Sequence, residues 1–229
     1  MSARRAVTNF VMKGCCLRRL HGSAAQRLTR AILDEIDLQA VRDGHPCPSF
    51  CSRAEMYRYL HSSRFNGDAM DYLEFGVFQG ASMRHWLELN RHEASRFYGF
   101  DSFEGLPEDW RPGQGKGHFD AGGLAPGIDD PRVEFIKGWF QDTVPAFSRC
   151  FAAKNRLVLH LDGDLYGSAM LPLVHFTPFM APGSLLIFDE FYDREHEFKA
   201  LTDWQRIYTK RFRIVAQMEN YAKVCIELL

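Results

Sequence analysis

Short apolar runs alternate with longer amphipathic segments from about residue 70 to the end of the chain. Most of the runs are apolar on both faces and stop at a glycine or an acidic residue, which is typical of strands covered on both sides. The segments 81–90, 171–180 and 195–210 are predicted to be helices. The predicted strands cover residues 72–77, 97–100, 133–136, 157–161, 184–188, 213–218 and 222–228.

The alternation of strands and helices predicts the sheet. Such βαβ units give a mostly parallel, doubly wound sheet of the Rossmann-like α/β class. The last two strands meet across a Glu219–Asn220 turn, so they predict an antiparallel strand at the C-terminal end of a seven-stranded sheet. We expect one domain over residues 1–229, with its core at 68–229, because this length suffices for a single core.

The N-terminal region differs in composition. The first 33 residues carry seven basic groups and no acid. Transit peptides and basic, partly disordered arms share this composition, but the spacing of Leu28, Ile32 and Ile36 favours an arm (1–23) that leads into helices over 24–62. We expect these helices either to cover part of a binding site or to form a homodimer interface.

The overall charge argues against two classes of protein. The chain has 28 basic and 29 acidic residues, whereas general nucleic-acid and membrane-surface binders carry a basic excess. No apolar stretch approaches the roughly 18 residues of a membrane span. Six scattered cysteines without a zinc-site spacing indicate free thiols in a reducing, cytoplasmic location. The expected partner is a small molecule, with neither nucleic acid nor membrane involved.

Ligands of a doubly wound sheet bind beyond the carboxyl ends of its strands. After the first strand, Gly76 and Gly80 form a Gly-x3-Gly turn that lets the backbone approach a ligand closely. The turn lacks both the dinucleotide and the phosphate-loop patterns. Asp101 follows Glu74 by 27 residues, at the predicted end of the second strand, where an acid can accept hydrogen bonds from ribose hydroxyls. An acid at this position without a phosphate-binding pattern suits a cationic adenosine ligand, for example S-adenosylmethionine.

One connection is unusually long. Residues 103–131 contain seven glycines and four prolines. Loops of this length inside a domain are usually functional or mobile. We therefore expect a flexible lid over the site, with plain surface disorder as the alternative.

Four carboxylates follow two neighbouring strands. Asp162 and Asp164 come after 157–161, and Asp189 and Glu190 come after 184–188. These strand ends should lie side by side, so the acids should converge. Clustered acids raise one another's pKa unless a cation neutralises them, and magnesium prefers oxygen ligands of this kind.

Five motifs carry a resemblance to a known family. GVFQGAS, YGFDSFEGLP, GWFQDT, LHLDGDLYGS and FDEFYD occur in the same order as in the macrocin O-methyltransferase family. The resemblance covers roughly residues 50 to 205. It implies a class I methyltransferase fold, S-adenosylmethionine as methyl donor, magnesium dependence and a hydroxyl acceptor, most often on a sugar of a natural product.

The resemblance also implies roles for individual residues. Asp164 matches the general base of the family. The metal ligands would be Asp162, Asp189 and Glu190. The donor would contact three groups of residues, namely Glu74, Gly76, Gly80 and Ser82 at its amino-acid end, Asp101 and Ser102 at the ribose, and Gly138, Trp139, Gln141 and Asp142 at the adenine.

The chain departs from the family at one motif, and two other functions compete. The family's usual Asp-Asp-Tyr is here Asp189-Glu190-Phe191, which changes the geometry around the acids. Asp162-Gly163-Asp164 also fits the Asp-x-Asp motif of nucleotide-sugar glycosyltransferases, and a non-catalytic S-adenosylmethionine-binding protein would share the fold. His160 is expected to be a hydrogen-bonded core histidine.

Overall fold

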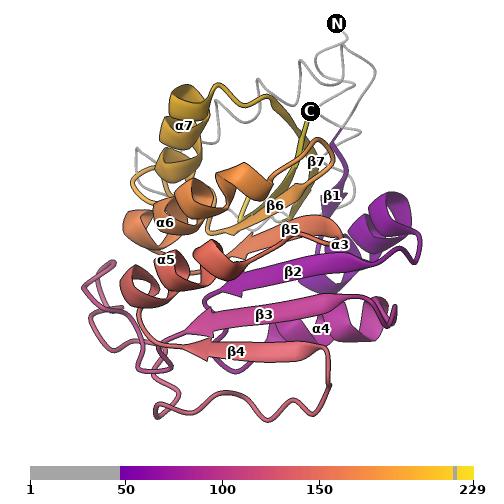
Figure 1. The fold of residues 1–229 in the computed structure, drawn as a ribbon. Coiled ribbons are helices and arrows are strands. Elements are labelled where there is room, and N and C mark those ends of the chain that lie inside the picture. Colours follow the sequence, from indigo (N-terminus) through magenta and orange to yellow (C-terminus); the bar gives the residue numbers. More distant parts are fainter. Residues whose placement is uncertain (1–46, 219–220) are drawn as a thin grey trace, which may run out of the picture.

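The computed structural model describes residues 47–218 and 221–229. They form one eight-stranded sheet in the order β1-β7-β8-β6-β5-β2-β3-β4 (Figure 1). The strands are β1 Ser49–Phe50, β2 Met70–Phe75, β3 Arg96–Asp101, β4 Val133–Lys137, β5 Arg156–Leu161, β6 Leu185–Asp189, β7 Phe212–Met218 and β8 Lys223–Leu228.

The sheet confirms the predicted fold class and adds one strand to it. All adjacent pairs are parallel except those of β8, which runs antiparallel to both β6 and β7. The additional strand, β1, lies within the segment predicted to be helical, and it pairs in parallel with the end of β7. A strand of two residues is too short to leave a periodic pattern in the sequence.

Helices cover both faces of the sheet (Figure 1). On one face, α5 (Phe140–Cys150), α6 (Tyr166–Phe176) and α7 (Glu197–Tyr208) pack over a large apolar cluster. On the other face, α3 (Arg53–Leu60) and α4 (Ala81–Leu89) pack over a second cluster. Two single-turn segments, a π-helix at His61–Phe65 and a 3-10 helix at Thr177–Phe179, extend α3 and α6.

The central strand β2 shows how the sequence produces these two layers. All six of its residues are buried. Tyr72 packs into the cluster under α3 and α4, and its neighbour Leu73 packs into the cluster under α5 to α7. Alternate side chains of a strand point to opposite faces, so an uninterrupted buried run requires helices on both.

The strand order places a ligand site at the carboxyl ends of β2 and β5. The chain passes from β2 outward to β3 and β4, and then returns to β5 on the other side of β2. Such a reversal of strand order opens a crevice where ligands bind in this class of sheet.

Part of the predicted N-terminal organisation lies outside the described residues. This applies to the basic arm, 1–23, and to the helical segment as far as residue 46. Within the described part of that segment, α3 begins at Arg53, where the Ser52 hydroxyl accepts a hydrogen bond from the backbone N–H of Glu55. Among the described helices, none combines the length and apolar character needed to cross a bilayer.

Candidate active site

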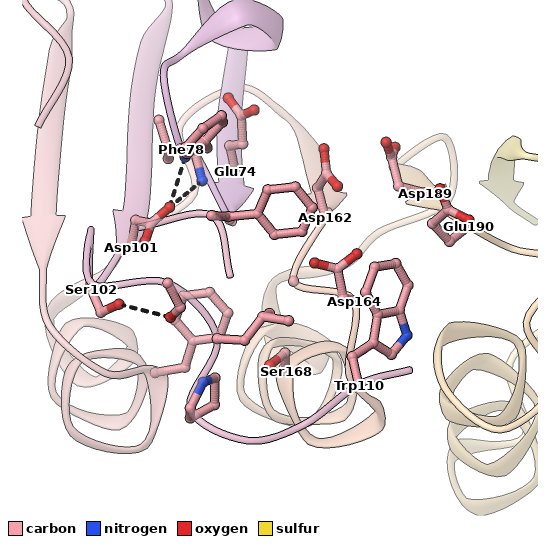
Figure 2. Close-up of a pocket in the computed structure, with 18 of the residues that line it drawn as sticks. Glu74, Phe78, Asp101, Ser102, Trp110, Asp162, Asp164, Ser168, Asp189 and Glu190 are labelled. Atoms are coloured by element: carbon pink, nitrogen blue, oxygen red, sulfur yellow. Dashed lines mark hydrogen bonds between the residues drawn. The ribbon is translucent and has the colours of Figure 1, made fainter. Parts of the chain in front are cut away.

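A cavity of about 610 Å³ opens at the carboxyl ends of β2, β3, β5 and β6 (Figure 2). The four acids predicted to bind metal or take a proton all line it. Of the residues expected to bind a methyl donor, Gly80 and Asp142 are not among those lining the cavity, and the others are. The lining residues that were predicted are Glu74, Gly76, Ser82, Asp101, Ser102, Gly138, Trp139, Gln141, Asp162, Asp164, Asp189 and Glu190.

Gly76 allows the ends of β2 and β5 to approach each other. Its φ is +95°, and a Cβ at this position would lie 1.9 Å from the backbone oxygen of Asp162. On either side of this contact, Gly76 N donates to Phe100 O at 3.0 Å and Asp162 N donates to Phe75 O at 2.9 Å. The glycine turn therefore fixes the position of Asp162 as well as offering backbone to a ligand.

Asp101 is held by backbone rather than left open. Its Oδ2 accepts hydrogen bonds from the N–H groups of Val77 and Phe78, at 2.8 and 2.7 Å, as Figure 2 shows. Its Oδ1 accepts one from Phe103 N at 2.7 Å. A carboxylate oxygen has two acceptor sites, so Oδ1 keeps one for a ligand. The expected contact of Asp101 with a ribose stays a prediction. The structure shows in addition that Asp101 orders the turn after β2.

Glu74 presents an unpaired carboxylate oxygen inside the protein. The residue is 1% exposed, and its Oε2 has no hydrogen-bond partner among the described residues. Burial and the nearby charge of Asp162 raise its pKa well above the usual range, although Lys223 and Tyr72 oppose the shift. A buried acid that lines a cavity with one unpaired oxygen fits a ligand that brings a positive charge or a hydrogen-bond donor.

Three potential metal ligands converge beside it. One ligand atom each from His160, Asp162 and Asp189 lie within 4.8 Å of one another. Burial raises the pKa of Asp162, while Lys223 and Arg53 act in the opposite direction. Two carboxylates in a buried, mixed-charge site fit a divalent cation.

His160 is the buried, hydrogen-bonded histidine that was expected, but its position gives it a second role. Its Nδ1 lies 2.7 Å from the Tyr72 hydroxyl, and its Nε2 lies 3.2 Å from Asp189 Oδ1. Burial, together with Lys223 and Arg53, lowers its pKa well below the usual value, so the ring is neutral. A neutral imidazole can hold Asp189 in place or act as a ligand itself.

Asp164 is a buried acid whose pKa lies near neutral pH. It is 8% exposed and has a φ of +61°. Burial, with the neighbouring charges of Asp162 and Glu190, raises its pKa to about 8, and Arg111 opposes this. A positive ion bound among these acids would lower the pKa again and favour the carboxylate form that accepts a proton.

Glu190 pairs with a residue of the long connection. Its Oε2 lies 3.3 Å from Arg111 Nη1 and accepts a hydrogen bond from the Tyr192 hydroxyl. Phe191, which replaces the tyrosine usual in the family, is 1% exposed and packs against Phe188 and Phe198. The replacement therefore removes a hydroxyl from a position in the apolar core and not from the surface of the cavity.

Residues 103–131 lie against the cavity, and this agrees with their expected role as a lid. Leu106, Trp110, Arg111 and Phe119 all line it. Trp110 is 8% exposed, its indole N–H has no partner among the described residues, and the Arg111 guanidinium lies 3.7 Å from its ring centre. Leu106 and Arg111 could not be singled out from the sequence, because a loop rich in glycine and proline gives no register for its side chains.

Arg53 is a further lining residue that the sequence did not reveal. It begins α3, and its Nη1 donates to the Ser82 hydroxyl at 3.4 Å. The Tyr57 hydroxyl, one turn later in α3, lies 3.3 Å from the same oxygen. The described N-terminal helix thus contributes a cation to the wall of the cavity, and a buried hydroxyl that contacts the lining residue Ser82.

The sequence profile of one known family matches this chain. The profile of macrocin-O-methyltransferase (TylF) covers residues 58–225, which includes both the glycine turn and the acids. The chain belongs to the macrocin-O-methyltransferase family. The resemblance inferred from the five motifs is thereby confirmed, and the matched region extends further toward the C-terminus than those motifs do.

Curated relatives of this chain are named as O-methyltransferases. The chain is 34% identical to the 8-demethyl-8-(2,3-dimethoxy-alpha-L-rhamnosyl)-tetracenomycin-C 4'-O-methyltransferase of Streptomyces olivaceus, over 53% of this chain and 52% of that protein. It is 42% identical to the mycinamicin III 3''-O-methyltransferase of Micromonospora griseorubida, over 28% and 24% of the two chains. The chain spans at most about half the length of these curated relatives.

Solved structures share the fold. The O-methyltransferase NovP superposes with a TM-score of 0.56 at 22% identity, over 76% of each chain. The calicheamicin methyltransferase CalS11 superposes with a TM-score of 0.58 at 19% identity, over 91% of this chain and 94% of that one. The macrocin-O-methyltransferase family member described here therefore has the class I methyltransferase fold predicted from its sequence.

Proposed function

We propose that this protein is an S-adenosylmethionine- and divalent-metal-dependent O-methyltransferase whose acceptor is a hydroxyl on a sugar of a glycosylated natural product. The observation that carries the proposal is that one cavity holds two groups of acids. Glu74 and Asp101, at the ends of β2 and β3, form the group assigned to the donor, and Asp162, Asp164 and Asp189, at and after the ends of β5 and β6, form the group assigned to the metal and the proton. The names of the curated relatives, which are methyltransferases of glycosylated compounds, support the choice of acceptor.

The residues on the donor side would bind and orient the methyl donor. Glu74 offers its unpaired Oε2 to the amino group of the donor, and Asp101 offers the remaining acceptor site of Oδ1 to the ribose. Trp139 and Gln141, at the start of α5, would border the adenine. Methyl transfer is an in-line attack on the sulfonium carbon, so fixing the donor beside the acceptor removes much of the entropic barrier.

The residues on the acid side would activate the acceptor. Asp162 and Asp189 would hold the divalent cation, with His160 beside them. When bound, the cation supplies a Lewis acid that makes a hydroxyl easier to deprotonate. Asp164 accepts the proton from the acceptor hydroxyl, and the lid residue Trp110 helps to exclude water from the cavity.

The N-terminal region would complete the acceptor side. Arg53 of α3 lines the cavity, and Tyr57 contacts the lining residue Ser82, so the preceding residues, 24–46, are suitably placed in the chain to cover it or to form a homodimer interface. Removal of residues 1–46 should then reduce turnover or dimerisation while leaving donor affinity unchanged. Full activity of the shortened monomer would contradict this part of the proposal.

Calorimetry and a labelled-donor assay test the function. We expect micromolar binding of S-adenosylmethionine, no binding of nucleotide sugars, and methyl transfer to a glycosylated polyol that EDTA abolishes and Mg²⁺ restores. Binding of a nucleotide sugar would instead identify a glycosyltransferase. Donor binding without transfer to any acceptor would identify a non-catalytic binding protein.

A matched pair of variants tests the acid cluster. Asp162→Asn should lower turnover at least a hundredfold and leave donor affinity within about threefold, because the substitution removes one cation ligand on the acid side. Asp68→Asn is the control and should leave both unchanged, since Asp68 is an exposed acid before β2 that does not line the cavity. Full turnover by Asp162→Asn would refute the assigned active centre.

A further inference from the structure

A buried lysine lies among the proposed metal ligands. Lys223, the first residue of β8, is 1% exposed. The antiparallel register of β6 and β8 places it directly opposite Asp189, and its ammonium group forms an ion pair with Asp189 Oδ1. The same ammonium lies 3.4 Å from His160 Nε2.

The lysine is in contact with two of the three groups that could hold a metal. His160, Asp162 and Asp189 offer ligand atoms within 4.8 Å of one another, and Lys223 contacts the first and the last of them. The Tyr57 ring, 5.9 Å from the ammonium, closes the site from α3. A divalent ion bound by these atoms would therefore lie within a few ångströms of a buried positive charge.

The other cations near the cavity have different partners. Arg111 pairs with Glu190, and Arg53 donates to the Ser82 hydroxyl. Among the described residues, Lys223 is thus the cation that pairs with a carboxylate of the candidate metal group. Without it, Asp189 and Asp162 would be half-buried acids side by side, with no cation from the described part of the chain paired with either.

We propose that Lys223 is a resident counter-cation of this site, which holds Asp189 in the metal-free protein and which a divalent ion must displace. This inference rests on the metal site of the proposed function. Its consequence is a lowered affinity for the metal, because binding requires that the ion pair break and because the two cations repel each other. The protein is then ordered at the acid cluster before any metal binds.

Manganese binding tests the inference without any acceptor. Titration with Mn²⁺ alone, followed by calorimetry or by the electron paramagnetic resonance signal of the free ion, gives a Kd for the full-length protein and its variants. Lys223→Met removes the charge and keeps an unbranched side chain of similar length. We expect it to bind Mn²⁺ at least tenfold more tightly than the wild type.

Thermal unfolding provides a second readout. In EDTA, Lys223→Met should unfold at a lower temperature than the wild type, because its acids have lost their counter-charge. Saturating Mn²⁺ should raise its unfolding temperature by more than it raises that of the wild type. Lys223→Gln, a polar substitute, should behave in the same way should the methionine variant fail to fold.

Two controls separate charge from packing. Lys199→Met breaks the exposed ion pair with Asp203 on α7 and should leave the Mn²⁺ affinity unchanged. Lys223→Arg keeps the positive charge and should keep the weak affinity. An affinity of Lys223→Met equal to or below that of the wild type would overturn the inference, as would an equal gain in Lys223→Arg.

The outcome also distinguishes the inference from the proposed function. Tighter Mn²⁺ binding by Lys223→Met without methyl transfer by the wild type would support the inference and reject the enzyme activity. Methyl transfer with unchanged Mn²⁺ affinity would reject the inference alone. The absence of Mn²⁺ binding in both proteins would reject the metal site and, with it, both proposals.

Discussion

Replacing Gly76 by alanine separates two physical demands on the turn between β2 and α4. The first is conformational, since the φ of +95° is unfavourable for any residue with a Cβ and costs about 1–2 kcal/mol. The second is steric, because the new Cβ would lie 1.9 Å from Asp162 O, whereas real Cβ atoms essentially never lie within 3.0 Å of a neighbour. The ends of β2 and β5 must therefore move apart by about 1 Å.

That movement weakens two backbone hydrogen bonds, from Gly76 N to Phe100 O and from Asp162 N to Phe75 O. Each is worth about 1 kcal/mol net. The sum is a loss of about 3–4 kcal/mol in the free energy of unfolding. At about 2–4 °C per kcal/mol for a protein of this size, the unfolding temperature should fall by about 6–16 °C.

Gly67→Ala is the matched control. Gly67 has nearly the same φ, +93°, but a Cβ there would meet nothing within 4 Å. It should lose only the conformational part, about 1–2 kcal/mol. Urea unfolding of both variants measures the difference, and S-adenosylmethionine and Mn²⁺ titrations should show weaker binding in Gly76→Ala alone. Equal stability losses in the two variants would refute the steric reasoning.

Three further substitutions test the energetics of buried groups. Asp71 is buried, yet hydrogen bonds from Arg96 and from the backbone N–H groups of residues 154 and 155 lower its pKa. Asp71→Asn should therefore cost about 2–3 kcal/mol in the free energy of unfolding. In acid unfolding, the wild type should lose this stabilisation as the pH falls below about 4. Burial, with nearby acids, raises the pKa of Glu197, and neither of its carboxylate oxygens has a hydrogen-bond partner among the described residues. Glu197→Gln should therefore stabilise the protein increasingly as pH rises above about 4.3, by about 1.4 kcal/mol per pH unit until the raised pKa of the folded state is reached. Urea unfolding at pH 5 and pH 8 should show that the stability of the variant changes less with pH than that of the wild type. Phe191→Tyr should cost about 1–3 kcal/mol in thermal unfolding, because its hydroxyl would be buried against phenylalanine rings.

Each of these has a result that would contradict it. An Asp71→Asn protein as stable as the wild type at pH 7 would show that the bonds from Arg96 contribute nothing net. A Glu197→Gln protein whose stability kept the wild-type pH dependence would place the titration elsewhere. A more stable Phe191→Tyr protein would mean that the hydroxyl finds a partner.

The strands of the core could be predicted because their burial is visible in the sequence. Strands such as β6 begin with an uninterrupted apolar run, Leu185–Phe188, and a chain that alternates such runs with helices has few possible topologies. Helix α5, in contrast, was not predicted. Pro145 lies within it, and proline disfavours a helix interior, although Phe140, Val144 and Phe147 recur at helical spacing and pack on the apolar cluster.

The site was predictable to the extent that it depends on strand ends. Asp162 and Asp189 lie together because adjacent parallel strands end at one edge of the sheet, and the sequence places an acid at each end. Lys223 could not be found in this way. It begins an antiparallel strand, and its pairing with Asp189 depends on a register that a single sequence does not determine.

The three backbone N–H groups on the Asp101 carboxylate give this residue two tasks at once. Val77 and Phe78 belong to the turn that follows β2, whereas Phe103 is the first residue of the connection that lies over the cavity. One side chain thus holds the turn after β2 and the start of the 103–131 connection in fixed positions relative to each other. Weaker donor affinity in an Asp101 variant would consequently follow from the loosened frame alone, even if the nucleoside had never touched that carboxylate.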